Sequence, residues 1–304
     1  MIPFSLRQLD HAVAAARHEN VTAAARALNV SQPAISASIA RIEQHYGRPL
    51  FVRHAGQGVS LTPFGRQFIR EAASLVTAAR GLAGLGDDDG RISGELIIGC
   101  YEGIAPILLP GLLQAFGQRH RDVVLHFREA PFDGLSRLLE QGSIDLALGY
   151  QAALNGQYAR VVLAERKPYA MMPAGHPLTA LRRLRLRDVA AHPLVLSAQP
   201  TTWANTHALF RSRGLEPVVA MRARSFELQR ALIARGFGVG IATTRPISDK
   251  TYDGASLICR DIDEALPRQG IVVAYDQAGL SPAGRAFIDT AVACLADPSP
   301  RRKK

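Results

Sequence analysis

Residues 22–43 constrain this chain more than any other stretch, because they follow the pattern of two short helices joined by a tight turn. Thr22 is predicted to cap the first helix, and the alanines after it favour helix formation. Asn29 tolerates the left-handed backbone conformation that ends a helix. Ser31 is predicted to cap the second helix, with Pro33 in its first turn, where a missing N–H costs nothing.

The second of these helices has two faces of different chemistry. Its apolar stripe consists of Ile35, Ile39, Ile42 and Tyr46. The opposite face is small and polar, lacks acidic residues, and carries Pro33, Ala37, Ala40, Arg41 and Gln44. Small residues allow close approach to a DNA groove, and amide or guanidinium groups can bond base edges and phosphates. The pattern therefore favours a helix that enters the major groove, although a helical hairpin packed in a core shares the spacing.

A small β-hairpin is predicted after this helix. Residues 50–53 and 59–61 have the composition of short strands, and a glycine-containing turn joins them. Arg53 and the turn could reach the DNA backbone or a neighbouring minor groove, as the wing of a winged helix does.

A long helix is predicted from residue 63 to about residue 84, with Thr62 as its cap. Small and large residues alternate along it at the spacing of a coiled-coil seam, namely Gly65, Phe68, Ala72, Leu75, Ala79 and Leu82. We expect this helix to pair with its copy in a dimer, because two helix-turn-helix units are needed to span two half-sites. Packing against its own domain is the alternative.

Composition and charge limit the possible functions. The 304 residues are 47% apolar and 20% charged, which suits a globular protein of two or three units. The net charge of +10 is concentrated: residues 1–86 hold nine arginines and four acids, and the last four residues are all basic. This distribution suits binding of DNA phosphates, with the tail as a solvated end. Three widely spaced cysteines and the lack of a signal peptide predict a cytoplasmic protein.

From residue 95 onwards, strands and helices alternate. Strands are predicted at 96–99, 123–129, 145–149, 169–172, 194–196, 238–242 and 270–275. Helices are predicted at 104–118, 132–141, 202–213, 225–234 and 281–295. The order predicts two α/β units with largely parallel sheets, the last helix returning to the first unit. The polar, glycine-rich residues 84–90 are predicted to be a hinge.

The N-terminal motifs resemble those of the LysR-type transcriptional regulator family, and they lie at 6–9, 22–25, 30–34, 39–43, 50–53 and 61–65. Later motifs resemble the family's effector domain, at 109–110, 142–148, 176–178, 210–214 and 234–241. The resemblance covers nearly the whole chain. It implies an effector fold like that of type 2 periplasmic solute-binding proteins, a homotetramer built as a dimer of dimers, double-stranded DNA and a small-molecule effector as partners, and no cofactor.

The resemblance also implies a domain order. A winged helix-turn-helix domain (1–62) precedes a linker helix (63–84), a hinge (85–94), an effector-binding domain (95–300) and a basic tail (301–304). Within the effector domain, two Rossmann-like subdomains are expected, subdomain I at about 95–165 and 270–300 and subdomain II at about 166–269. The candidate DNA-binding residues are Thr22, Ser31, Gln32, Pro33, Ser36, Ala37, Ala40, Arg41, Gln44, Arg53 and Thr62.

An effector site is predicted where strands end beside helix N-termini. Hydroxyls and free amides at helix starts favour an anion, so we expect an effector with a carboxylate. The candidate residues are Cys100, Tyr101, Glu102, Arg128, Thr202, Trp203, Ser225 and Phe226. Trp203 could cover an aromatic body, and Arg128 could pair with an acid. Cys100 lacks a basic neighbour, so a wall residue is favoured over a redox sensor.

The sequence is compatible with two alternatives. Residues 242–246 read Ala-Thr-Thr-Arg-Pro where the family usually has Leu-Leu-Pro, so the chain could be a winged-helix repressor without a working effector site. It could also be a solute-binding or enzymatic α/β protein with an unrelated helical hairpin. No dinucleotide-binding, Walker or nucleophile-elbow motif and no histidine pair with metal-ligand spacing is present, so an enzyme is not expected.

Overall fold

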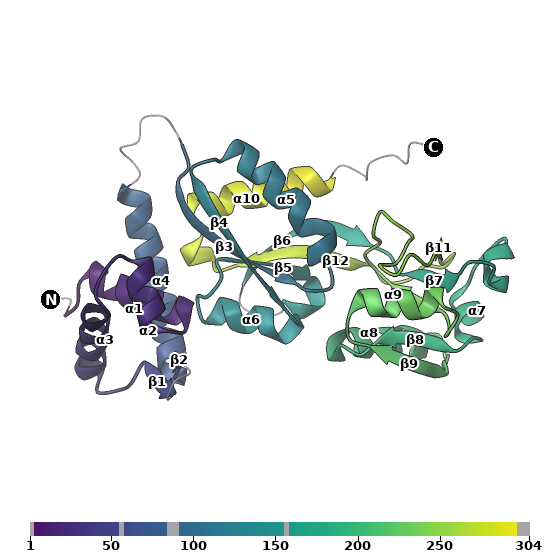
Figure 1. Cartoon of the computed structure of the whole chain (residues 1–304), viewed down its shortest axis with the longest axis horizontal. Helices are drawn as coiled ribbons and strands as arrows, with labels where there is room; N and C mark the ends of the chain where they lie inside the picture. Colours follow the sequence, from purple (N-terminus) through teal and green to yellow (C-terminus); the bar gives the residue numbers. More distant parts are fainter. Residues whose placement is uncertain (1–2, 55–57, 84–90, 155–157, 297–304) are drawn as a thin grey trace.

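The computed structural model describes residues 3–54, 58–83, 91–154 and 158–296. Figure 1 shows three bodies in a row, with the N-terminal unit at one end, a larger sheet flanked by helices in the middle and a smaller α/β unit at the other end. The predicted hinge at 84–90, the tip of the wing and the basic tail lie outside the described residues. No described helix combines the length and apolarity that a membrane span requires.

The N-terminal unit is a winged helix. Its elements are α1 (Leu6–His18), α2 (Val21–Ala27), α3 (Gln32–Tyr46), β1 (Phe51–His54), β2 (Gly58–Leu61) and α4 (Pro63–Ala83). The core of this unit is alanine-rich in α1 and α2 and isoleucine-rich in α3. Inside it, His11 Nδ1 and Ser38 Oγ share a hydrogen bond of 2.8 Å, which ties α1 to α3. This buried polar bond therefore helps to fix the angle at which α3 crosses α1.

The helix starts of this unit differ from the prediction. Asn20, not Thr22, caps α2, because its Oδ1 accepts from the amides of Thr22 and Ala23 at 2.8 and 3.0 Å. Ser31 occupies the capping position of α3, but its side chain makes no capping bond. Asn29 has the predicted left-handed conformation, with φ of 53°.

The wing and α4 form as predicted. β1 and β2 pair antiparallel, from Phe51 opposite Leu61 to His54 opposite Gly58. Gly58 has φ of +93°, and a Cβ there would lie 2.2 Å from the Glu19 carbonyl oxygen, so only glycine fits beside the end of α1. Thr62 caps α4 by accepting from the Gly65 amide at 2.8 Å.

The predicted apolar stripes are only partly buried. Tyr46 at the end of α3 is 41% exposed, although its ring contacts Phe64 and Phe68. In α4, Ala72 faces the domain core, whereas Leu75 and Leu82 are 54% and 70% exposed. The expected single seam of α4 is therefore divided between two faces.

The middle body, called subdomain I here, contains a five-stranded sheet in the order β4-β3-β5-β12-β6. Its elements are β3 (Gly94–Tyr101), α5 (Ala105–Arg119), β4 (Val123–Ala130), α6 (Phe132–Glu140), β5 (Leu146–Tyr150), β6 (Ala159–Arg166), β12 (Gln269–Tyr275) and α10 (Pro282–Ala296). β3, β4 and β5 are parallel, and β12 runs antiparallel to β5 and β6. Helices α5 and α10 cover one face and α6 the other (Figure 1). The return of α10 to this body was predicted.

The third body, called subdomain II here, contains two small sheets, β10-β7-β11 and β8-β9. Its elements are β7 (Tyr169–Pro173), α7 (Leu186–Ala190), β8 (Leu194–Ser197), α8 (Pro200–Arg211), β9 (Val219–Ala223), α9 (Phe226–Ala234), β10 (Gly240–Ala242) and β11 (Leu257–Asp261). β7 pairs antiparallel with β10 and β11, whereas β8 and β9 run parallel, so the largely parallel sheet predicted for this unit is wrong for its larger sheet. Strands β6, β9 and β11 were not predicted, because they are partly exposed and lack a continuous apolar run.

Candidate functional site

The outer face of α3 is open to solvent. Ile35, Ile39 and Ile42 are buried under the helix, as predicted. On the other side, the exposed residues are Ser31, Gln32, Pro33, Ala37, Ala40, Arg41 and Gln44, while Ser36 is half-buried. No described part of the protein covers this face, so a DNA groove can reach it.

Glu43, the acidic residue of α3, places no negative charge on this outer face. Glu43 turns inward, and its Oε1 accepts from the amides of Leu50 and Phe51 at 2.7 and 3.3 Å. The exposed groups are then amides, small side chains and the Arg41 guanidinium, which is the set that base edges and phosphates bind. Thr22 and Arg53 are also exposed, whereas the Thr62 hydroxyl already donates to the Pro49 carbonyl oxygen.

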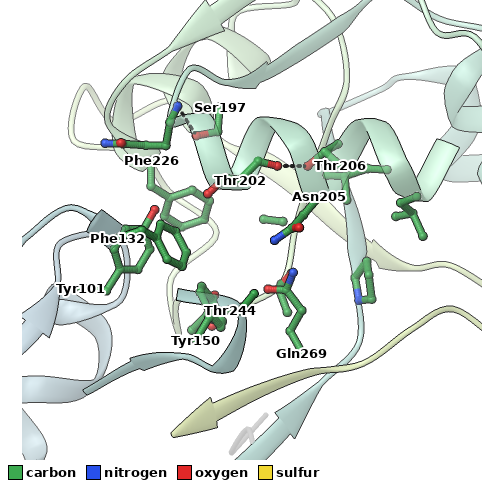
Figure 2. Close-up of a pocket in the computed structure, with 18 of the residues that line it drawn as sticks. Tyr101, Phe132, Tyr150, Ser197, Thr202, Asn205, Thr206, Phe226, Thr244 and Gln269 are labelled. Atoms are coloured by element: carbon green, nitrogen blue, oxygen red, sulfur yellow. Dashed lines mark hydrogen bonds between the residues drawn. The ribbon is translucent and has the colours of Figure 1, made fainter. Parts of the chain in front are cut away.

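A cavity of about 810 Å³ lies between subdomains I and II. This size suits a small molecule. Figure 2 shows three aromatic rings from subdomain I on one side, and the hydroxyls and amides of α8, Thr244 and Gln269 around the rest. Five of the eight candidate effector residues line it: Tyr101, Glu102, Thr202, Ser225 and Phe226.

Hydrogen bonds connect the two walls of this cavity. The Glu102 carboxylate accepts from Gln199 Nε2, and the hydroxyls of Tyr150 and Thr244 share a bond of 2.5 Å. Burial raises the pKa of Tyr150, so its hydroxyl stays protonated and able to donate. Each of these pairs joins subdomain I to subdomain II. The relative position of the subdomains, and hence the shape of the cavity, depends on them.

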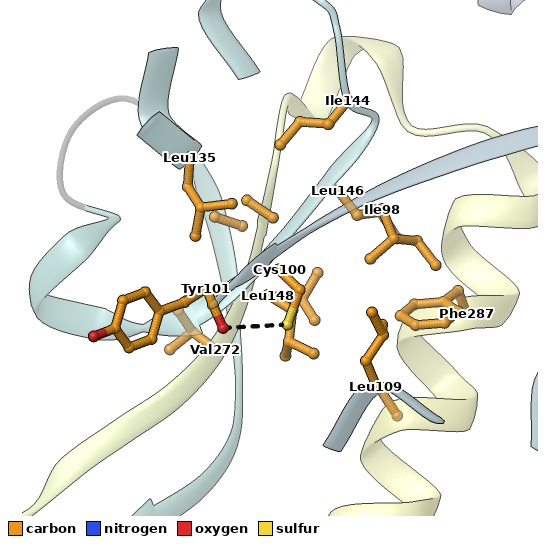
Figure 3. Close-up of a cluster of buried hydrophobic side chains, with 14 of the residues drawn as sticks. Ile98, Cys100, Tyr101, Leu109, Leu135, Ile144, Leu146, Leu148, Val272 and Phe287 are labelled. Atoms are coloured by element: carbon orange, nitrogen blue, oxygen red, sulfur yellow. Dashed lines mark hydrogen bonds between the residues drawn. The ribbon is translucent and has the colours of Figure 1, made fainter. Parts of the chain in front are cut away.

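Cys100 does not line the cavity, contrary to the prediction. The side chains of neighbouring residues in a strand point to opposite faces, so Tyr101 reaches the cavity while Cys100 enters the core. Cys100 is fully buried among Ile98, Leu148 and other apolar residues (Figure 3). Burial is also the largest cause that raises the pKa of its thiol, which disfavours a reactive thiolate.

Arg128 and Trp203 also lie away from the cavity. The Arg128 guanidinium donates to the carbonyl oxygen of Arg17 at 2.6 Å, so it contacts the N-terminal unit. The Trp203 ring stacks on Arg222, whose guanidinium carbon is 3.5 Å from the ring centroid. Helical periodicity explains the second case, because Thr202 and Trp203 point about 100° apart around α8.

Several cavity residues were missed in the sequence. Phe132 begins α6, Tyr150 ends β5, and Gln269 begins β12, so three distant segments supply them. Residues 242–246, whose sequence differs from the Leu-Leu-Pro usual in the family, belong to the site, because Thr243 and Thr244 line the cavity. The position of Tyr150 at the carboxyl end of a strand could have indicated it. Gln269 could not be found in this way, because the sequence does not show that β12 pairs with β5. Among the described residues, no group of three His, Cys, Asp or Glu could hold a metal ion.

The N-terminal unit contacts subdomain I through a group of hydrogen-bonded residues, Arg17, Asp145 and Ile97. Arg17 Nη2 donates to Asp145 Oδ1 at 2.7 Å, and Asp145 Oδ2 accepts from the Ile97 amide at 2.8 Å. Ile97 lies in β3, and Asp145 immediately precedes β5. The other ends of these strands supply Tyr101 and Tyr150 to the cavity. Two strands therefore run from the contact with α1 to the cavity wall.

Comparison with known proteins points to one family. A model described as a bacterial regulatory helix-turn-helix protein of the lysR family matches residues 6–66, and the LysR substrate binding domain matches residues 89–295. The HTH-type transcriptional regulator TfdS of Cupriavidus pinatubonensis is 30% identical over 294 residues, 94% of this chain and 97% of that protein.

Solved structures agree with these matches. HinK, a LysR family transcriptional regulator from Pseudomonas aeruginosa, is 31% identical and has a TM-score of 0.65, covering 96% of this chain and 99% of its own. CbnR, a LysR family regulator solved in complex with its target DNA, shares the fold with a TM-score of 0.57 at 21% identity, covering 96% of this chain and 100% of that chain.

Proposed function

The chain belongs to the LysR family of transcriptional regulators, and we propose that it reads a two-fold symmetric DNA site through α3 and the wing. It is a regulator with a helix-turn-helix DNA-binding domain and a substrate-binding domain, not an enzyme. In the proposal, a small molecule in the cavity between subdomains I and II controls its DNA binding. The observation that carries the DNA assignment is the open face of α3, held in place by three buried isoleucines.

Base reading is assigned to the middle of α3. Ala37 and Ala40 leave room for the floor of the groove, and Arg41 and Gln44 can form hydrogen bonds to base edges. Gln32, Ser36 and Arg53 are assigned to the DNA backbone, where contacts fix the register of the protein without reading sequence. This division predicts different effects for substitutions in the two groups.

Dimerisation is assigned to α4. Leu75 and Leu82 are seven residues apart, so they lie on the same side of the helix, and both are exposed in the single chain. A second copy of α4 would bury them. By analogy with the family, two such dimers form a tetramer.

Control by the effector requires a path between the cavity and the N-terminal unit. β3 and β5 provide one, because Asp145 accepts from both Arg17 and the Ile97 amide, and the other ends of the two strands reach the cavity. A ligand shifts DNA binding only if it prefers one arrangement of the subdomains. The effector carboxylate expected from the helix starts stays a prediction.

Selection from random DNA with the full-length protein, followed by footprinting, tests this proposal. We expect an enriched site with two inverted half-sites centred about 10 bp or a multiple of it apart, and a steep loss of affinity with added salt. Enrichment of no sequence, or of a site without two-fold symmetry, would contradict the proposal.

A further inference from the structure

The carboxylate of Glu102 lies where the predicted effector carboxylate was expected. Glu102 directly follows β3 and lines the cavity, and its backbone amide donates to the Ala130 carbonyl oxygen at 3.1 Å. The buried Gln199, which precedes α8, donates its side-chain amide to this carboxylate from the opposite wall. A protein carboxylate thus already occupies the space beside the start of α8.

No basic side chain neutralises this acid among the described residues, since Glu102 forms no ion pair there. Arg224 and Arg268 also line the cavity, but both are exposed, and Arg268 lies 3.7 Å from Glu165. Of the charged residues in the lining, only Glu102 is half-buried. An anionic ligand placed here would meet a like charge that water screens poorly.

The wall beside Glu102 is aromatic. The rings of Tyr101 and Phe132 have centroids 4.0 Å apart, and Phe132 and Tyr150 are nearly parallel at 6.1 Å and 19°. Figure 2 shows these rings on one side of the cavity and Phe226 above them. Such faces bind a flat apolar body, and their negative π-clouds also attract a cation.

From these observations we infer that the effector carries a protonated nitrogen on a flat, largely apolar body, and that Glu102 binds this nitrogen. The inference rests on the proposed function, since it assigns the chemistry of the same cavity. The aromatic rings hold the body, while Thr202, Asn205 and Gln269 offer uncharged hydrogen-bonding groups to its remaining atoms. An effector of the opposite charge is disfavoured at the position of Glu102.

A matched pair of probes tests the sign of the charge. 2-Phenylethylamine and 3-phenylpropanoate share the ring and chain length but end in an ammonium and a carboxylate. Calorimetry with the full-length protein is expected to give a dissociation constant for the amine at least about tenfold below that for the carboxylate, as a charge-assisted hydrogen bond implies. Tighter binding of the carboxylate, or no binding of the amine at about 10 mM, would overturn the inference.

Two variants test whether the amine binds to the Glu102 carboxylate or responds only to the overall negative charge of the protein. Glu102→Gln keeps the shape and the acceptor for Gln199, and it is expected to weaken amine binding by about 10- to 100-fold. The control Asp133→Asn removes an exposed acid of α6 that does not line the cavity, and it should leave amine binding within about twofold. Unchanged amine binding in Glu102→Gln would overturn the assignment of Glu102.

Footprints recorded with the same protein distinguish this inference from the proposed function. If the carboxylate binds and alters the protected DNA, the cavity is an effector site and only the inferred chemistry is wrong. If the protein selects no DNA site at all, the proposed function itself fails, whichever probe binds.

Discussion

The contact between α1 and subdomain I predicts an energetic coupling between the DNA-binding unit and the effector domain. Arg17 and Asp145 lie 2.7 Å apart, with side chains that are 14% and 23% exposed. Removing one partner of a fully buried ion pair lowers the free energy of unfolding by about 3–5 kcal/mol, whereas an exposed ion pair contributes about 0.2–1 kcal/mol to it. The partial exposure and the remaining bond from the Ile97 amide to Asp145 place the expected cost of Arg17→Met between these limits, at about 1–3 kcal/mol.

A double-mutant cycle measures the pair itself. Arg17→Met, Asp145→Asn and the double variant are compared by urea unfolding followed by circular dichroism. We expect the cost of the double variant to be smaller than the sum of the single costs by about 1–2 kcal/mol. Arg7→Met is the matched control, because Arg7 is exposed on the same helix, and it should change the free energy of unfolding by less than about 0.5 kcal/mol.

If the costs of the two single variants add to within about 0.5 kcal/mol, Arg17 and Asp145 are not coupled and the contact does not join the two units energetically. A pH series gives a second test of the same contact. Partial desolvation, and then Arg128, lower the pKa of the largely exposed His18 from its usual 6.5. Protonation of His18 therefore opposes the packed arrangement, so the contact should be intact above pH 6.5 and weaken as the pH falls below it. A contact that strengthens on acidification would contradict this sign.

Further predictions concern the dimer, the thiols and a helix cap. Leu75→Glu should lower the mass of the assembly in sedimentation experiments, because it places a charge in the proposed α4 contact; an unchanged mass would exclude that contact. At pH 8 a thiol reagent should modify the exposed Cys294 in the folded protein and Cys100 only after unfolding, since burial raises the pKa of Cys100; equal rates would contradict this. Asn20→Ala should lower stability by about 1 kcal/mol in thermal unfolding and Thr22→Ala by much less, and the reverse order would favour the cap first predicted.

The arrangement of the N-terminal unit was predictable because each local signal agreed with the next. Helix formers, the left-handed Asn29 and the isoleucine stripe of α3 all favour one structure. The choice between Asn20 and Thr22 as cap was not predictable, since both residue types cap helices and two positions separate them. Boundaries of this kind depend on the hydrogen bonds that form in the folded chain.

The cavity was only partly predictable. Residues at strand ends such as Tyr101 and Glu102 were found, because the carboxyl ends of parallel strands share one edge of a sheet. Cys100 was assigned to the wrong face, since a shift of one residue reverses the direction of a strand side chain. Gln269 comes from a segment more than a hundred residues away, and the antiparallel pairing of β12 that brings it there leaves no local mark in the sequence.

Recognition of DNA by the outer face of α3 is tested most directly by the affinity of Arg41→Ala and Gln44→Ala for the selected DNA site. Fluorescence anisotropy at fixed salt should show that at least one of the two variants loses about 1–3 kcal/mol of specific binding and tolerates changes at one base position. Arg211→Ala, an exposed arginine of subdomain II, should bind like the wild type. Wild-type affinity and specificity in both α3 variants would contradict the account.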